Sequence, residues 1–196
     1  EATRRGAYKG WEPDIFLGIS LIGKTLGVVG FGGIGTMVAR RAEGYAMKVI
    51  YTKRTKDEKS VELDELLAIS DVVTLHVPLT EETRHIINNH TLAKMKKGSY
   101  LVNTARGPIV DEHALVDSLR DGHLAGAALD VFDNEPNIDP ELIGMPNVIT
   151  TPHIASATHE AREAMAKLAV SGILDTLSSK IPVNIVNKEV WEKRRK

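Results

Sequence analysis

An apolar run, a cluster of glycines and the start of a helical pattern follow one another in GVVGFGGIG, residues 27–35. Gly30 allows a tight turn after a strand, Gly32 has no Cβ to keep a pyrophosphate from the backbone, and Gly35 lets the next helix pack closely on the sheet. The unpaired amides and the positive dipole end of that helix favour an anion. The loop predicts a dinucleotide site, although the motif alone would also fit a glycine-rich turn that binds nothing.

Strand and helix patterns on both sides of this loop favour the dinucleotide interpretation. Apolar residues 25–29 and 48–51 indicate strands, and a helical pattern covers 33–46 between them. Strands and helices then alternate, which calls for right-handed crossovers and a parallel sheet with helices on both faces. The predicted fold is therefore α/β, a Rossmann-type doubly wound parallel sheet. The other expected strands are 71–78, 99–103, 124–129 and 148–151, and the other expected helices are 60–69, a brief one from Thr80, 112–119 and 158–177.

The 196 residues, 42% of them hydrophobic, support one full α/β domain and leave too little chain for a second large one. Residues 1–22 show no lasting periodicity and are expected to form an N-terminal arm. Residues 23–178 are expected to form the dinucleotide-binding domain, in which the apolar side of the last helix packs on the core. Residues 179–196 contain an extended stretch with no evident partner in the chain, so part of the molecule is expected to be missing.

Composition and charge narrow the class of ligand. A net charge of -1, with 25 basic and 26 acidic residues, gives no reason to expect nucleic acid or a membrane surface as a partner. No apolar run reaches the ~20 residues that cross a bilayer. The lack of cysteine excludes a disulfide framework and fits a reducing cytoplasm. His76 and His159 are expected to be structural, no metal site is expected, and small molecules are the expected ligands.

Three side chains of different chemistry each follow a different predicted strand: Arg106, Glu135 and His153. Because ligands of open parallel sheets bind at the carboxyl ends of the strands, these side chains are expected to converge. A guanidinium pairs with a carboxylate, a histidine passes a proton near neutral pH, and a neighbouring carboxylate favours the imidazolium. Each residue alone would also fit an ordinary surface position, whereas the set suits a carbonyl acid as substrate.

At these residues the chain resembles the cofactor half of the D-isomer-specific 2-hydroxyacid dehydrogenases. The resemblance implies a cofactor domain whose substrate domain, built largely from residues before it, is largely absent. It also implies NAD(P)-dependent reduction of a small 2-keto acid, which the 196 residues alone are expected to scarcely perform. The matching segments are 30–35, 76–80, 95–96, 103–110, 129–136 and 152–154, and segments 10–13, 16–18, 156–158 and 182–187 resemble glyoxylate and hydroxypyruvate reductases, notably the archaeal glyoxylate reductases.

The resemblance also implies roles for single residues. Arg106 would hold the substrate carboxylate and polarise the keto oxygen, and His153 would protonate that oxygen as the hydride arrives. Glu135 would orient and charge His153, and Asp130 would hold the nicotinamide. The residues expected to contact the cofactor around the cleft are Gly30, Phe31, Gly32, Gly33, Ile34, Val77, Pro78, Thr104, Ala105, Arg106, Asp130, His153 and Ala155.

The segment after the second strand bears on the choice of cofactor. Lys53, Arg54 and Thr55 stand where an acid is expected for NAD. A carboxylate accepts the ribose hydroxyls, whereas two cations and a hydroxyl would favour a 2′-phosphate. NADP is therefore the expected cofactor, with NAD as the alternative. A solvated basic run is the other interpretation, since Asp57 and Glu58 follow closely.

Two further expectations concern partners. The arm around Trp11 has apolar residues but no regular element to bury them, and related reductases dimerise through the cofactor domain, so a homodimer is expected. A non-catalytic function stays open, because the same cofactor fold resembles transcriptional corepressors that sense dinucleotide. The presence of Arg106, Glu135 and His153 favours an enzyme.

Overall fold

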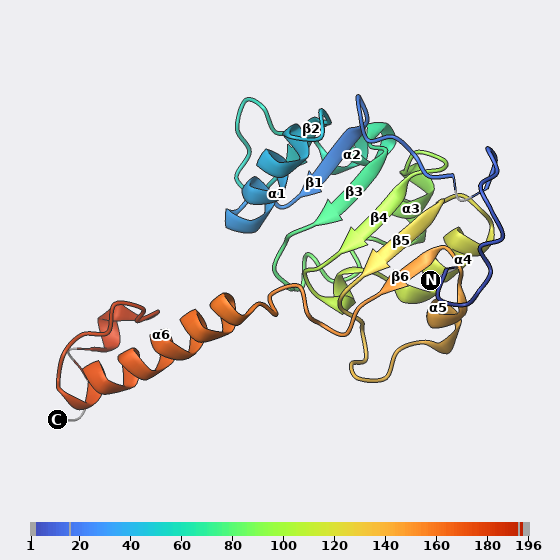
Figure 1. The fold of residues 1–196 in the computed structure, drawn as a ribbon. Helices are drawn as coiled ribbons and strands as arrows, with labels where there is room; N and C mark the ends of the chain where they lie inside the picture. The colour runs from blue at the N-terminus through green and yellow to red at the C-terminus, as the bar shows by residue number, and fades with distance from the viewer. Residues whose placement is uncertain (1–2, 16, 192, 194–196) are drawn as a thin grey trace. The chain divides into compact units, whose positions relative to one another are not determined.

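Two compact units make up the chain, residues 1–150 and residues 151–196. The computed structural model describes residues 3–15, 17–191 and 193 (Figure 1). Phe16 of the 16–18 pattern, together with the ends of the predicted arm and of the predicted C-terminal segment, lies outside the described residues. The predicted domain boundary at 178/179 lies inside the second unit and stays a prediction.

A parallel sheet is the centre of the first unit (Figure 1). Six strands of the described residues pair in the order β2-β1-β3-β4-β5-β6, so the order reverses between β1 and β3. Ligands of doubly wound sheets bind at such a reversal, beyond the carboxyl ends of the strands. The strands are β1 Thr25–Val29, β2 Lys48–Thr52, β3 Val72–Leu75, β4 Tyr100–Asn103, β5 Gly126–Leu129 and β6 Val148–Thr150.

Helices cover both faces of this sheet, because alternate side chains of a strand point to opposite sides. Val29 of β1 belongs to a large core shared with the helices after β2, β3 and β4, whereas Leu26 and Val28 belong to a smaller core beneath the helix after β1. The predicted Rossmann-type doubly wound fold is confirmed. The helices of the first unit are α1 Gly33–Glu43, α2 Leu63–Ile69, α3 Asn89–Lys94, α4 Glu112–Arg120 and α5 Pro140–Gly144, with a 3-10 turn η1 at Gly107–Ile109.

Two of the expected helix starts are wrong. Ser60 does not begin α2, because its hydroxyl accepts a hydrogen bond from the amide of Asp57 at 2.9 Å. No helix starts at Thr80, because the Thr83 hydroxyl donates to the carbonyl of Pro78 at 2.6 Å. Such bonds between side chains and nearby backbone offer the chain an alternative to a helix.

Asp71 ties together the amino ends of neighbouring strands. Its Oδ2 accepts a hydrogen bond from the amide of Thr25 at 2.8 Å, and its Oδ1 lies 2.6 Å from Lys96 Nζ and 3.6 Å from Lys24 Nζ. The side chain is only 15% exposed. The hydrogen bond from Lys96 is the main cause that holds the pKa of Asp71 below its usual value of 3.8.

We expect Asp71→Asn to lower the free energy of unfolding by about 1–3 kcal/mol at pH 7, measured by denaturant titration. Because the pKa of Asp71 is lowered on folding, its contribution is present above the unfolded pKa and is lost as pH falls through the folded pKa. The wild type and the variant should therefore converge in acid. Asp117→Asn, at a side chain 62% exposed and paired with Arg120, is the control and should cost less than about 1 kcal/mol. An undiminished difference at pH 2 would contradict this assignment.

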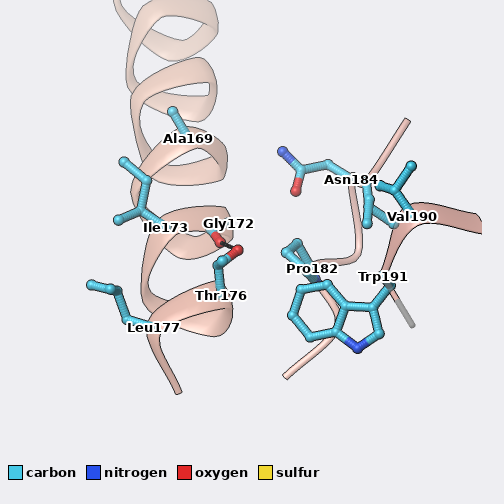
Figure 2. A pocket seen from close by; sticks show the side chains of 10 residues that line it. Ala169, Gly172, Ile173, Thr176, Leu177, Pro182, Asn184, Val190 and Trp191 are labelled. Atoms are coloured by element: carbon cyan, nitrogen blue, oxygen red, sulfur yellow. Dashed lines mark hydrogen bonds between the residues drawn. The ribbon is translucent and has the colours of Figure 1, made fainter. Parts of the chain in front are cut away.

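The second unit contains α6, His159–Leu177, and the segment that follows it, with a 3-10 turn η2 at Lys188–Val190. None of the α6 residues is buried. The packing of this helix on the core of the first unit stays a prediction. The segment after α6 lies along the helix and forms with it an open apolar pocket of about 550 Å³ (Figure 2). Among the described residues no helix is both long and apolar enough to cross a membrane. The pocket is lined by Ala169, Gly172, Ile173, Thr176, Leu177, Pro182, Asn184, Ile185, Val190 and Trp191.

Candidate cofactor and active site

The glycine loop lies where the strand order reverses between β1 and β3. Gly30 has a φ of +95°, and a Cβ there would lie 2.6 Å from the carbonyl oxygen of His76, so the turn closes directly against the end of β3. A Cβ on Gly35 would lie 2.1 Å from the Gly30 carbonyl oxygen, so α1 packs tightly on the turn. A Cβ on Gly32 would meet no described atom within 4 Å. The loop is therefore tight on its protein side and open on the other.

The first turn of α1 is arranged for an anion. Gly32 is the N-cap, and it offers no side chain to the amides that follow. The corresponding amides of α3, α4 and α6 are capped by Asn88, Asp111 and Thr158. The first turn of α1 also carries no acidic residue. Uncapped amides and the positive end of the helix dipole together favour a phosphate at this position.

A pocket of about 430 Å³ joins this loop to the loops after β3 and β4. Six residues expected to contact the cofactor lie together in its lining. His76 also lines the pocket, where its Nε2 lies 3.0 Å from the Thr74 hydroxyl, and partial burial lowers the pKa of His76. The structural role expected for His76 stays a prediction. The six residues are Ile34, Val77, Pro78, Thr104, Ala105 and Arg106.

The loop that carries Arg106 is held from below by Asn103, a buried residue at the end of β4. Its Nδ2 donates to the carbonyl of Arg106 at 2.9 Å, and its Oδ1 accepts from the amide of Ala105 at 3.0 Å. The Arg106 guanidinium donates to the carbonyl of Ala105 at 2.6 Å and is exposed. Asn103 was not among the predicted site residues. The signal for it was a polar side chain at the last position of an apolar strand.

The loop that carries Glu135 packs on the loop that carries Arg106. A Cβ on Gly107 would lie 1.8 Å from the carbonyl carbon of Phe132, so the two backbones are in direct contact. Glu135 Oε1 accepts a hydrogen bond from the amide of Phe132 at 2.9 Å. Asp130 is buried at the start of this loop. The structure therefore brings the loops of Arg106, Asp130 and Glu135 together at one edge of the sheet. The expected convergence of the Arg106, Glu135 and His153 side chains stays a prediction.

His153 and Ala155 belong to the second unit. His153 has a φ of +53°, a left-handed backbone conformation that is uncommon outside glycine. Its amide donates to the carbonyl of Thr151 at 3.1 Å. Backbone conformations of this kind are concentrated at functional sites. Because Arg106 and Glu135 belong to the first unit, the pairing of His153 with Glu135 stays a prediction.

The end of β2 is tied to the glycine loop. The amide of Gly30 donates to the carbonyl of Thr52 at 2.9 Å. The Phe31 ring stacks on the ring of Tyr51, with centroids 3.7 Å apart and an angle of 9° between the planes. The backbone bond and the ring stack place the segment after β2 beside the loop where a dinucleotide would bind.

The three residues expected at the 2′-position follow β2 directly. Arg54 and Thr55 are exposed. Lys53 Nζ lies 2.5 Å from Asp57 Oδ2, so this cation is paired within its own loop. No cluster of metal-binding side chains occurs in the described part of the chain.

Comparison with known proteins identifies the family. Residues 1–155 match the sequence profile described as D-isomer specific 2-hydroxyacid dehydrogenase, NAD binding domain. The chain belongs to this dehydrogenase family. Its glycine loop, its pocket and the loops of Arg106 and Glu135 all lie within the matched residues.

Members of the dehydrogenase family with similar sequences include glyoxylate reductases. The glyoxylate reductase of Thermococcus litoralis is 47% identical over an alignment of 200 residues, which covers 96% of this chain and 60% of the relative. The glyoxylate reductase of Thermofilum pendens is 48% identical over an alignment of 197 residues, which covers 95% of this chain and 58% of the relative. A solved Thermus thermophilus protein superposes with a TM-score of 0.91 at 47% identity, covering 94% of this chain and 60% of that one. A glyoxylate reductase from Paecilomyes thermophila gives 0.83 at 43% identity, covering 90% and 55%.

The chain spans about 60% of the length of the curated relatives it matches. Together with the parallel sheet, this coverage agrees with a cofactor domain whose substrate domain is largely absent from the 196 residues.

Proposed function

We propose that this chain is the cofactor half of an NAD(P)-dependent reductase that converts a small 2-keto acid, glyoxylate or hydroxypyruvate, to the 2-hydroxy acid. The observation that carries the proposal is the pocket that joins the uncapped start of α1 to Arg106. The start of α1 favours a pyrophosphate, and an exposed guanidinium favours a carboxylate. A cofactor and a small acid would thus meet at one edge of the sheet.

In this proposal each residue has a separate task. Arg106, held by Asn103, would bind the substrate carboxylate and polarise the keto oxygen. His153 would give its proton to that oxygen, and Glu135 would orient His153. Asp130 would hold the carboxamide of the nicotinamide. When bound, the nicotinamide supplies the hydride that is added to C2 of the acid.

The cofactor is proposed to be NADP rather than NAD. Arg54 and Thr55 are exposed beside the glycine loop, where a 2′-phosphate would accept their hydrogen bonds. In a titration of the 196-residue chain followed by nicotinamide fluorescence, we expect NADPH to bind about tenfold more tightly than NADH, a difference of about 1.4 kcal/mol. Arg54→Gln should weaken the binding of NADPH and leave the binding of NADH unchanged. Equal or tighter binding of NADH would reject the preference.

The proposed molecule is larger than the 196 residues. The exposed apolar side chains of α6 favour a second layer of protein over the second unit, and the segment 179–196 would return to a substrate domain there. Trp11 is 81% exposed, and Leu17 and Ile22 are also exposed, which favours packing of the arm on a second copy in a homodimer. The absence of cysteine is consistent with a cytoplasmic location.

Turnover tests the proposal against a corepressor-type binding protein. The full-length product of the gene should oxidise NADPH when glyoxylate or hydroxypyruvate is added. The 196-residue chain alone should bind NADPH but reduce little acid, because holding the substrate against the nicotinamide lowers the barrier by roughly 7 kcal/mol or more. Cofactor binding by the full-length product without turnover of either acid would favour the corepressor-type function.

A further inference from the structure

A single carboxylate in the loop after β2, that of Asp57, holds several groups at once. Its two oxygens accept the Tyr51 hydroxyl at 2.9 and 3.0 Å, and Oδ2 also lies 2.5 Å from Lys53 Nζ. Oδ1 further accepts hydrogen bonds from the amides of Lys59 and Ser60 at 3.1 and 2.9 Å. Asp57 therefore connects the basic segment to a fixed turn a few residues later.

This cluster, formed by Tyr51, Lys53 and Asp57, borders the cofactor loop. Tyr51 stacks on Phe31 of the glycine loop, and Lys53 Nζ lies 5.9 Å from the centroid of the Tyr51 ring. Lys53 is thus held between a carboxylate and an aromatic face, next to the position that a 2′-phosphate would take.

The ion pair between Lys53 and Asp57 affects how a 2′-phosphate would bind. The hydrogen bond between Lys53 and Asp57 is the main cause that raises the pKa of Lys53 and holds the pKa of Asp57 far below its usual range. Both groups are therefore charged at neutral pH. A 2′-phosphate would have to compete with Asp57 for the Lys53 ammonium.

We propose that Asp57 sets how strongly this chain distinguishes NADPH from NADH, by keeping Lys53 from the 2′-phosphate. The inference rests on the proposed function, since it requires a dinucleotide on the glycine loop. NADH has no 2′-phosphate, so its binding does not depend on Lys53. Asp57 is thus a specificity-determining residue that weakens the contribution of the basic segment.

Calorimetric titration of the 196-residue chain with NADPH, NADH, adenosine 2′,5′-bisphosphate and 5′-AMP tests this inference. Asp57→Asn removes the charge but keeps Oδ1 as acceptor for the turn. It should tighten NADPH and the bisphosphate about threefold to fivefold and leave NADH and 5′-AMP within about twofold. Glu58→Gln is the matched control, because it removes a negative charge from the next residue. It should change the ratio of the NADPH and NADH affinities less than Asp57→Asn does.

A double-mutant cycle shows whether the gain passes through Lys53. In a Lys53→Met background, Asp57→Asn should tighten NADPH by less than about twofold. Lys53→Met alone should also weaken NADPH by less than about twofold, because Asp57 already holds the ammonium. If Asp57→Asn fails to fold, the affinity of the Lys53→Met variant for NADPH still tests the inference.

Three results would overturn the inference: equal changes for NADPH and NADH, a gain that survives in the Lys53→Met background, or a large loss from Lys53→Met alone. Failure of the proposed cofactor site is separable, since the wild type would then bind neither NADPH nor NADH. Failure of the proposed reductase activity would appear as a lack of turnover and not in this titration. If the wild type binds NADH more tightly than NADPH, the proposed NADP preference is wrong. The effect of Asp57→Asn on the affinity for NADPH can still be measured in that case.

Discussion

Replacing His153 by alanine is expected to lower the turnover of glyoxylate by about 10²- to 10⁴-fold in the full-length product of the gene. In the proposed mechanism His153 gives the proton that the keto oxygen needs as the hydride arrives. Steady-state kinetics at saturating NADPH gives the loss in kcat. The affinity for NADPH, measured by fluorescence titration, should remain within about twofold, because the glycine loop is untouched.

His159→Ala is the matched control for this experiment. His159 lies six residues further along, at the start of α6, and is exposed. Its replacement should leave turnover within about twofold. Wild-type rates with glyoxylate and hydroxypyruvate after His153→Ala would remove the assignment of the proton donor.

Gly32→Ala is expected to weaken the binding of NADPH by at least about tenfold while the protein stays folded. The backbone of Gly32, with φ -88° and ψ -158°, is accessible to alanine, and the added Cβ meets no described atom within 4 Å. The methyl group would instead occupy the space through which a pyrophosphate approaches the amides of α1. The unfolding free energy should fall by about 1 kcal/mol or less, since alanine is a poorer N-cap than glycine.

Alanine variants of two other glycines serve as controls for Gly32→Ala. Gly144→Ala, at the end of α5 with no described atom within 4 Å of the new Cβ, should change neither stability nor affinity much. Gly35→Ala should reduce both, because its Cβ would lie 2.1 Å from the Gly30 carbonyl oxygen. Wild-type affinity in Gly32→Ala would show that the pyrophosphate does not lie on this loop.

The sheet could be predicted from the sequence because each strand is a short apolar run bounded by turn residues. For β1 the predicted bounds, 25–29, agree with the structure. By contrast, α3 was missed because its six residues are too few to show a periodicity. Its signal is the capping box of Asn88 and Thr91, which is local chemistry rather than pattern. The periodicity of α6 identified a helix but gave no information on what covers it.

The site was predictable to the extent that topology determines it. Residues after parallel strands share one edge of the sheet, and this places Val77 and Arg106 in one pocket. The sequence marks Asn103 only as a polar residue at the end of an apolar strand. The hydrogen bonds of Asn103 and Asp57 could not be predicted, because they form only in the folded loops. Asp57, for example, reaches back six residues to the hydroxyl of Tyr51.

Transfer of deuterium from the cofactor to the acid tests the proposed reductase activity most directly. The full-length product would be incubated with glyoxylate and with NADPH doubly deuterated at C4 of the nicotinamide, and the glycolate formed would be analysed by mass spectrometry. Hydride transfer to C2 predicts glycolate with one deuterium on that carbon. Glycolate without deuterium, or no glycolate from an enzyme that binds NADPH, would contradict the proposed function.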